Sequence, residues 1–283
     1  MKIARVLVIA GSDSGGGAGI QADIRTITML GGHPMTAITA VTAQNTLGVQ
    51  AVHSVPTDIV MAQITSVAGD IGVDAVKIGM IGSAETADAV ADWLSGFRHP
   101  GLEPGSGALG GEGSGTLVHG RGEGGLPVVF DPVMVATSGS VLADPATIAA
   151  FGRLMRLATV VTPNLPELEA LGGEGAARAT GAAVLVKGGH GTGPRIQDRL
   201  VEPTGAETVW THPRIDTPHT HGTGCTLASG IATGLAQGLA LAAATDRAID
   251  YVQSALAAAP GIGAGHGPMG HALGMVPFDR CRG

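Results

Sequence analysis

The chain has 283 residues, a formal net charge of −7 and two cysteines, Cys225 and Cys281. This acidic balance argues against nucleic acid or an anionic membrane surface as a partner. Two cysteines give no disulfide framework and no metal-ligand spacing, which favours a reducing, cytoplasmic location. Hydrophobic residues make up 44% of the sequence but aromatic residues only 2%, so Ala, Val, Ile, Leu and Met must build the core. No apolar run reaches the roughly 18 residues that a membrane-spanning helix needs.

Short apolar strands alternate with amphipathic helices along the first half of the chain. Strands are predicted at residues 5–10, 35–42, 73–78 and 127–131. Their continuous apolar character is typical of a parallel sheet that is covered on both faces. Helices are predicted at about 20–30, 57–67 and 84–94, and Thr57 is expected to cap the second of them. The Gly-rich segment 100–125 has no periodicity and is predicted to be a flexible surface insertion.

The same alternation continues in the second half. Asp144 and Pro145 predict the start of a helix that runs to about residue 157. Strands are predicted at 158–162 and 182–187, with a short helix that opens at Asn164 and ends near residue 172. The glycine content of segment 172–181 is expected to prevent a helix there. Short polar strands are predicted at 199–201, 208–211 and 214–216, followed by helices at about 224–238 and 241–259. The pattern predicts an α/β fold with a mostly parallel sheet between two helical layers.

Chemically distinctive residues follow nearly every predicted strand. In an open parallel sheet, ligands bind beyond the carboxyl ends of the strands. The residues expected at that edge are Gly11–Gly19, Gln44, Asn45, Gly79, Met80, Asp131–Met134, Asn164, Glu167 and Lys187–His190. We therefore expect one ligand site along this edge.

The side chains at this edge suggest a phosphorylated ligand and a flat ring. Asp131 and Glu167 carry oxygen ligands of the kind that Mg²⁺ prefers, although each alone could be a capping acid. Lys187 ends an apolar strand, which favours a phosphate partner over a solvated lysine. Gln44 offers a donor and an acceptor that suit the edge of an aminopyrimidine, or it is a turn amide. Met80 and Val133 could form a slot for a flat ring or belong to the core.

The run His219–Thr226 precedes a long Ala- and Leu-rich stretch with helical character. A Gly222-Thr223-Gly224 turn at a helix N-terminus exposes backbone N–H groups, and the helix dipole adds partial positive charge there. These features predict an anion hole for a transferring phosphoryl group. Cys225 lies at the helix mouth, where the pKa of a thiol is expected to fall. The alternative is a Gly-rich loop that merely starts a helix.

The Gly15–Gly19 loop lacks the spacing of a dinucleotide fingerprint.

With these motifs the chain resembles the hydroxymethylpyrimidine/phosphomethylpyrimidine kinases of thiamine biosynthesis, in the ribokinase superfamily. The resemblance is most specific at Gln44-Asn45-Thr46 and Gly222–Cys225. It covers nearly the whole chain except segment 100–125, which is expected to have no counterpart. It implies one three-layer α/β/α domain over residues 1–283 and a cytoplasmic homodimer. It also implies ATP- and Mg²⁺-dependent phosphorylation of 4-amino-5-hydroxymethyl-2-methylpyrimidine and then of its monophosphate.

The resemblance also implies a role for each site residue. The pyrimidine pocket would consist of Gly11, Ala18, Asp23, Gln44, Met80 and Val133. The residues serving ATP would be Asn164, Glu167 and Lys187, with Mg²⁺ near Asp131 and Glu167. The anion hole would consist of Gly222, Thr223, Gly224 and Cys225, and Lys187 would offset the remaining phosphoryl charge. Cys225 would accept the proton of the hydroxymethyl group or orient that hydroxyl. Gly15 and Thr137 depart from the serine and the lysine that are usual in the family.

Two other functions remain open at this stage. A pyridoxal kinase of the same fold would also take a flat heteroaromatic ring with a hydroxymethyl arm, and Gln44 alone favours the aminopyrimidine. A non-catalytic ligand sensor would have kept the pocket and lost turnover, but the presence of Lys187, Glu167 and Cys225 argues against it.

Overall fold

The computed structural model describes residues 3–96, 125–136, 139–191 and 193–273. The predicted insertion 100–125 therefore lies almost entirely outside the described residues, as do Thr137 and Cys281. Within the described ranges, every helix is too short or too polar to span a bilayer.

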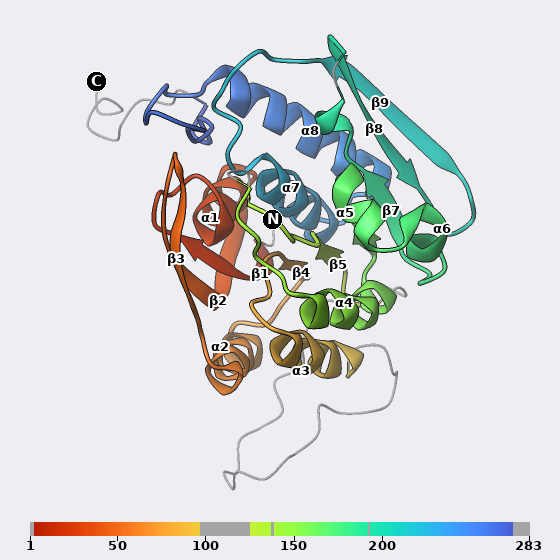
Figure 1. Cartoon of the computed structure of the whole chain (residues 1–283). Coiled ribbons are helices and arrows are strands. Elements are labelled where there is room, and N and C mark those ends of the chain that lie inside the picture. The colour runs from red at the N-terminus through yellow and green to blue at the C-terminus, as the bar shows by residue number, and fades with distance from the viewer. Residues whose placement is uncertain (1–2, 97–124, 137–138, 192, 274–283) are drawn as a thin grey trace, which may run out of the picture.

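Nine strands of this described part form one central sheet (Figure 1). Their order is β3-β2-β1-β4-β5-β6-β7-β8-β9. The strands are β1 (Ala4–Asp13), β2 (Gly32–Asn45), β3 (Gly48–Ser54), β4 (Ala75–Ile78), β5 (Val128–Phe130), β6 (Val160–Val161), β7 (Ala183–Val186), β8 (Arg195–Val201) and β9 (Glu207–Pro213). All neighbours from β2 to β7 are parallel, whereas β3, β8 and β9 pair antiparallel at the two edges. The prediction of a mostly parallel sheet is confirmed.

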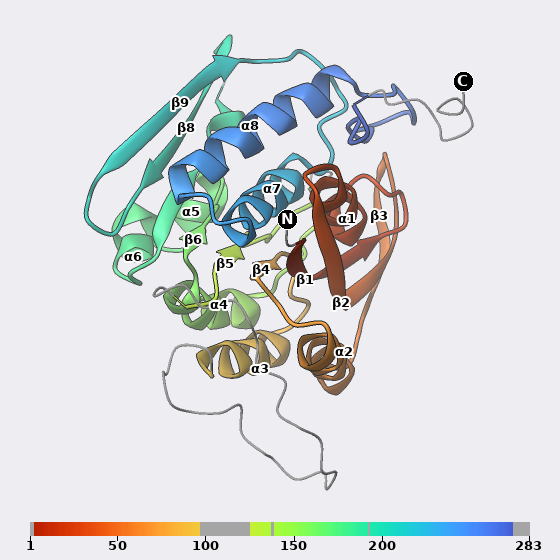
Figure 2. The same ribbon diagram turned by 180° about the vertical axis from the view of Figure 1, so that it is seen from behind.

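Helices cover both faces of this sheet (Figures 1 and 2). One layer contains α1 (Gly19–Met29), α7 (Thr223–Ala236) and α8 (Leu241–Ala257). The other contains α2 (Thr57–Asp70), α3 (Ala84–Ser95), α4 (Pro145–Leu157), α5 (Leu165–Ala170) and α6 (Gly173–Arg178). Strand β1 contributes side chains to two cores. Val6 and Val8 lie in the core under α1, α7 and α8, whereas Leu7 and Ile9 lie in the core on the other face of the sheet. The alternation of side chains along a strand thus builds two cores, and the three-layer prediction is confirmed.

Of the two helix caps predicted from local sequence at Asp144 and Thr57, one is correct and one is wrong. The Asp144 side chain accepts a hydrogen bond from the N–H of Thr147 at 2.7 Å, which confirms the predicted cap of α4. The predicted cap at Thr57 is wrong. The N-terminal cap of α2 is Pro56 without a side-chain bond, and the Thr57 hydroxyl lies 3.0 Å from that of Thr86 instead.

Three segments differ from the prediction. Strand β3 was not predicted because most of its residues are exposed and provide no apolar run. Segment 172–181 does contain a helix, α6, in which Ala177 is buried in the core and Glu174 forms an ion pair with Arg199 of β8. The predicted strand at 214–216 is absent from the described sheet, which ends with β9.

The chain after α8 folds back over the ends of β2 and α7. The His266 N–H donates to the carbonyl oxygen of Thr46 at 2.8 Å, just beyond the end of β2. Further along, the Tyr251 hydroxyl donates to the His271 carbonyl oxygen at 2.7 Å, and His271 Nε2 lies 2.9 Å from the Thr226 hydroxyl in the first turn of α7. His271 is buried, and this burial lowers the pKa of its imidazole to about 4.

The buried His271 should make the protein sensitive to acid. The unfolded chain binds a proton at the ordinary imidazole pKa near 6.5, but the folded chain does so only near pH 4, so stability is complete above 6.5 and is lost as the pH falls. The expected loss is at most about 3 kcal/mol. Urea unfolding between pH 7 and pH 4 measures it. His271→Gln, which can still bond to Thr226, should show a shallower decline, and an identical decline would contradict this account.

Candidate active site

An ion pair links the ends of β5 and β7. Lys187 Nζ lies 2.7 Å from Asp131 Oδ1 and 3.8 Å from Glu167 Oε2. Burial alone would lower the pKa of Lys187, but the two carboxylates raise it. Burial and the charge of Asp131 raise the pKa of Glu167, against the influence of Lys187. The Thr162 hydroxyl also donates to Asp131 at 3.0 Å, so this predicted group of residues is assembled in one place.

A second ion pair lies fully buried nearby. Lys77 of β4 and Asp23 of α1 are both 0% exposed, and their charged atoms lie 2.9 Å apart. The Ser229 hydroxyl donates to the same carboxylate at 2.7 Å. Asp23, which the resemblance assigns to the pyrimidine pocket, is therefore enclosed and cannot touch a ligand without rearrangement. It supports the site by holding Lys77, whose positive charge lowers the pKa of Cys225.

The charges of this region suit a ligand that arrives with a divalent cation. The carboxylates of Asp23, Asp131 and Glu167 outnumber the ammonium groups of Lys77 and Lys187 by one, before any phosphate binds. Among the described residues, no group of three or more His, Cys, Asp or Glu could hold a metal ion by itself. Mg²⁺ is commonly bound by one or two carboxylates together with phosphate oxygens. Asp131 and Glu167 fit that arrangement.

The N-terminus of α7 faces the Asp131–Lys187 pair. A Cβ atom on Gly224 would lie 3.3 Å from Lys187 Nζ and 3.4 Å from Asp131 Oδ2. The Thr223 N–H is directed to the Thr220 carbonyl oxygen at 3.3 Å, so it is not available to a ligand. In the described ranges, the N–H groups of Gly224 and Cys225 have no backbone acceptor. Among the described residues, these two N–H groups therefore lack a backbone partner at the end of α7 that lies beside the ion pair.

The cap of α7 requires glycine for two reasons. Gly222 has φ +90, a left-handed conformation that costs other residues energy. A Cβ atom there would also lie 2.0 Å from the carbonyl oxygen of Gly17. The loop that follows β1 and the N-terminus of α7 therefore meet backbone to backbone.

The pKa of the Cys225 thiol is shifted in the opposite direction from the one predicted. Burial raises its pKa to about 11, although the positive charge of Lys77 works in the other direction. Removal from water disfavours the thiolate more than the helix terminus favours it. The predicted fall in pKa is wrong, and the thiol is protonated at neutral pH.

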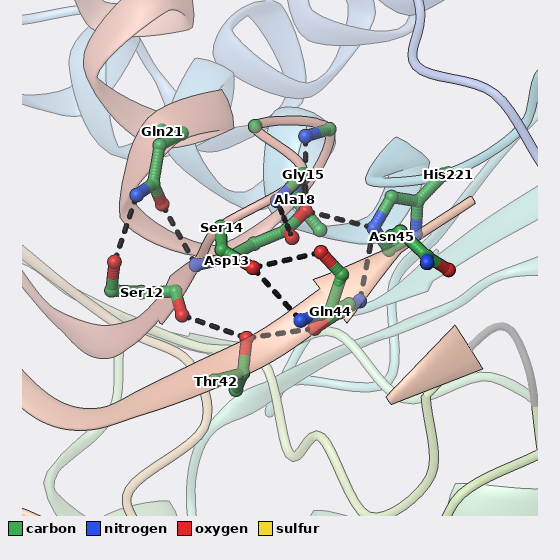
Figure 3. Close-up of polar contacts among 12 residues, drawn as sticks. Ser12, Asp13, Ser14, Gly15, Ala18, Gln21, Thr42, Gln44, Asn45 and His221 are labelled. Carbon is green, nitrogen blue, oxygen red and sulfur yellow. Dashed lines mark hydrogen bonds and ion pairs between the residues drawn. The ribbon is translucent and has the colours of Figure 1, made fainter. Parts of the chain in front are cut away.

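A network around Asp13 was not predicted (Figure 3). Asp13 ends β1, and its carboxylate accepts hydrogen bonds from the N–H groups of Gly15, Gly17 and Ala18 at 2.7, 2.9 and 2.8 Å. His221 Nε2 lies 2.9 Å from the same carboxylate. Burial would raise the pKa of Asp13, but these partners together lower it. One side chain thus connects the loop after β1 with the residue that precedes the cap of α7.

Gln44 completes this network at the end of β2. Its backbone N–H donates to the Ser14 hydroxyl at 2.8 Å, and that hydroxyl donates to the Gln44 carbonyl oxygen at 2.7 Å. Its amide nitrogen lies 3.1 Å from His221 Nε2, and its amide oxygen lies 3.2 Å from the Thr42 hydroxyl.

The sequence held one clue to Asp13: an acid in a Gly-rich loop can satisfy several exposed backbone N–H groups.

The other residues predicted for the pyrimidine pocket and for ATP follow the neighbouring strands. The Met80 methyl group packs against Gly11, where a Cβ atom would lie 2.3 Å from it. The Val133 side chain is half-buried two residues beyond Asp131. Asn164 and Glu167 hold each other in a capping box at the start of α5, with both bonds at 2.8 Å. Asn164 thus orients Glu167.

Comparisons of the sequence with known proteins agree on one family. A model of the family described as phosphomethylpyrimidine kinase matches residues 13–102 and 107–270. A hydroxymethylpyrimidine/phosphomethylpyrimidine kinase of Streptomyces coelicolor is 43% identical over 94% of this chain and 93% of its own length. A thiamine biosynthesis multifunctional protein ThiED of Corynebacterium efficiens is 41% identical over 94% of this chain, which spans only 35% of that longer protein.

Solved structures show the same fold. A pyridoxal kinase from Staphylococcus aureus, in complex with ADP, has a TM-score of 0.79 at 28% identity, covering 96% of this chain and 95% of its own. A phosphomethylpyrimidine kinase from Clostridium difficile has a TM-score of 0.67 at 34% identity, covering 90% of this chain and 99% of its own.

Adding one methyl group at Gly224 should weaken nucleotide binding. The new Cβ of Gly224→Ala would press on the Asp131–Lys187 pair, so we expect the affinity for a non-hydrolysable ATP analogue to fall about tenfold, or about 1.4 kcal/mol. Titration calorimetry measures this. Gly175→Ala in α6 is the matched control, because a Cβ there meets nothing within 4 Å. Equal affinities in the Gly224 variant and the wild type would remove α7 from the nucleotide site.

Proposed function

The chain belongs to the phosphomethylpyrimidine kinase family, and on that premise we propose which of its residues perform each part of the reaction. It is a phosphotransferase of thiamine biosynthesis that phosphorylates 4-amino-5-hydroxymethyl-2-methylpyrimidine and then the monophosphate. The phosphoryl donor in this proposal is ATP. The observation that carries the assignment of residues is the closeness of the Asp131–Lys187 pair to Gly224, at the start of α7, where in the described part of the chain the N–H groups of Gly224 and Cys225 have no backbone acceptor.

The phosphoryl group is stabilised by charge and position in this proposal. Phosphoryl transfer passes through a loose transition state with charge on the equatorial oxygens, so catalysis depends mainly on positioning and electrostatics. The N–H groups of Gly224 and Cys225 bind two of those oxygens, and the ammonium of Lys187 offsets the charge that remains. Mg²⁺, held by Asp131 and Glu167 together with phosphate oxygens, would supply further positive charge. The excess of carboxylates around Lys187 supports this last assignment.

The pyrimidine lies next to this anion hole, between the ends of β1, β2 and β4. Gln44 binds the donor and acceptor edge of the ring, and Met80 and Val133 contact its faces. Ala18 lets the ring approach the loop that follows β1, and Gly11 makes room for the Met80 methyl group beside the ring. The packing of Met80 against Gly11, where a Cβ atom would lie 2.3 Å from that methyl group, supports this role of Gly11. The hydroxymethyl arm then points to Cys225 and the anion hole.

In this proposal Cys225 orients the attacking hydroxyl and does not act as a general base. Its pKa of about 11 leaves little thiolate at neutral pH. Cys225→Ala should therefore lower kcat about fivefold to tenfold, the worth of one hydrogen bond, and Cys225→Ser should retain most of the activity. The kcat of the wild type should be flat between pH 6.5 and 8.5. A loss of 10²–10⁴, or a kcat that rises tenfold per pH unit, would identify Cys225 as the base.

A second candidate substrate is pyridoxal, which the fold similarity to a pyridoxal kinase favours. A coupled assay with ATP compares the pyrimidine, its monophosphate and pyridoxal directly. We expect kcat/KM to be at least about tenfold higher for the pyrimidine than for pyridoxal. Gln44→Leu should raise the KM of the pyrimidine by about 10- to 100-fold, because a buried hydrogen bond is lost, and should leave the KM of ATP unchanged. Faster turnover of pyridoxal would overturn the substrate assignment.

We also propose that the protein is a homodimer in the cytoplasm. The β2–β3 hairpin at the edge of the sheet supports a dimer, because it exposes Val41, Leu47 and Val52 by 47%, 68% and 48%. Cys225 is a free thiol, which is consistent with a reducing compartment.

A further inference from the structure

We propose that Asp13 and His221 are positioning residues that fix which way the amide of Gln44 faces, and so determine which pyrimidines the site accepts. The proposal rests on the function proposed above, in which Gln44 binds the ring edge. It adds two residues that do not touch the substrate themselves. These three side chains come from the ends of β1 and β2 and from the residue before the cap of α7, and Figure 3 shows them meeting.

The position of one proton decides the geometry. Asp13 is 3% exposed and holds three backbone N–H groups as an anion, so its carboxylate can only accept hydrogen bonds. His221 Nε2, at 2.9 Å from Asp13 Oδ2, must therefore carry a proton and donate it. The Gln44 amide group at 3.1 Å from the same nitrogen must then present its oxygen, because two N–H groups would repel each other.

Thr42 requires the same orientation of the amide. The Thr42 hydroxyl has one proton, and the Ser12 carbonyl oxygen at 3.0 Å can only accept it. The Thr42 oxygen is then an acceptor for the end of the Gln44 amide that lies 3.2 Å away. A half-turn of the amide exchanges its nitrogen and oxygen without changing its shape and removes both conflicts. The His221 Nε2 proton is then shared between Asp13 and the amide oxygen, and the amide nitrogen donates to Thr42. His221 and Thr42 thus select one of two amide orientations.

The selected orientation leaves a defined edge for the substrate. The amide oxygen retains one lone pair beyond its bond from His221, and the amide nitrogen retains one N–H beyond its bond to Thr42. An adjacent acceptor and donor match the exocyclic amino N–H and the ring nitrogen of a 4-aminopyrimidine. A 4-oxopyrimidine presents the reverse pattern, with a ring N–H and a carbonyl oxygen. Without His221 or Thr42 the amide can turn over, and the reversed ring gains a partner.

The test compares two substrates that differ only in this pattern: 4-amino-5-hydroxymethyl-2-methylpyrimidine and its 4-oxo analogue. The readout is the ratio of the two kcat/KM values, with the KM of ATP and the melting temperature measured alongside. We expect His221→Leu to lower the amino-to-oxo ratio at least tenfold. Thr42→Val tests the same amide from its other side and should lower the ratio in the same direction. His33→Leu, at an exposed position of β2, is the matched control and should leave the ratio unchanged.

The remaining outcomes separate this proposal from the function on which it rests. Adding His221→Leu to Gln44→Leu should change the ratio no further, because both act through one amide. A ratio that is unchanged in Thr42→Val and in folded His221→Leu overturns the proposal. Equal losses for both substrates give His221 a structural role only and also overturn it. If Gln44→Leu itself leaves the ratio unchanged, Gln44 does not bind the ring, and the pocket assigned under the proposed function fails.

Discussion

The carboxylate of Asp13 is the contact on which the site depends. It gathers three backbone N–H groups of the loop after β1 and a ring nitrogen of His221. His221 immediately precedes Gly222, whose backbone lies so close to Gly17 that a Cβ atom would meet its carbonyl oxygen at 2.0 Å. The loop, the cap of α7 and the end of β2 are therefore held as one unit. The proposed pyrimidine and phosphoryl sites share a single wall as a result.

Electrostatics is the reason for proposing that the nucleotide binds together with Mg²⁺. Buried charges are costly unless they are paired, and the site pairs Asp23 with Lys77 and Asp131 with Lys187. Glu167 lies 3.8 Å from Lys187 and raises the negative charge further. A triphosphate approaching alone would be repelled, so a divalent cation is part of the nucleotide that this arrangement suits. Burial keeps Cys225 protonated by raising its pKa; Lys77 opposes this effect, and Asp23 and Asp131 add to it.

The sequence predicted those features that depend on local pattern. Apolar runs identified the parallel strands, and the rule that ligands bind at their carboxyl ends placed Gln44, Asp131, Glu167 and Lys187 along one edge. Features that depend on distant partners were missed. Helix α6 forms because Ala177 is buried and Glu174 finds Arg199, which a glycine-rich local sequence cannot reveal. The pairing of Asp13 with His221 spans 208 positions of the chain. The pKa of Cys225 depends on burial, which motif spacing does not report.

The most direct test of the account is a crystal structure of the protein with a non-hydrolysable ATP analogue, Mg²⁺ and hydroxymethylpyrimidine. The account predicts the γ-phosphate within hydrogen-bond distance of the Gly224 and Cys225 N–H groups. It also predicts the amino edge of the ring on the amide of Gln44, with Asp13 and His221 behind it. A pyrimidine bound away from Gln44, or a γ-phosphate away from the start of α7, would contradict it.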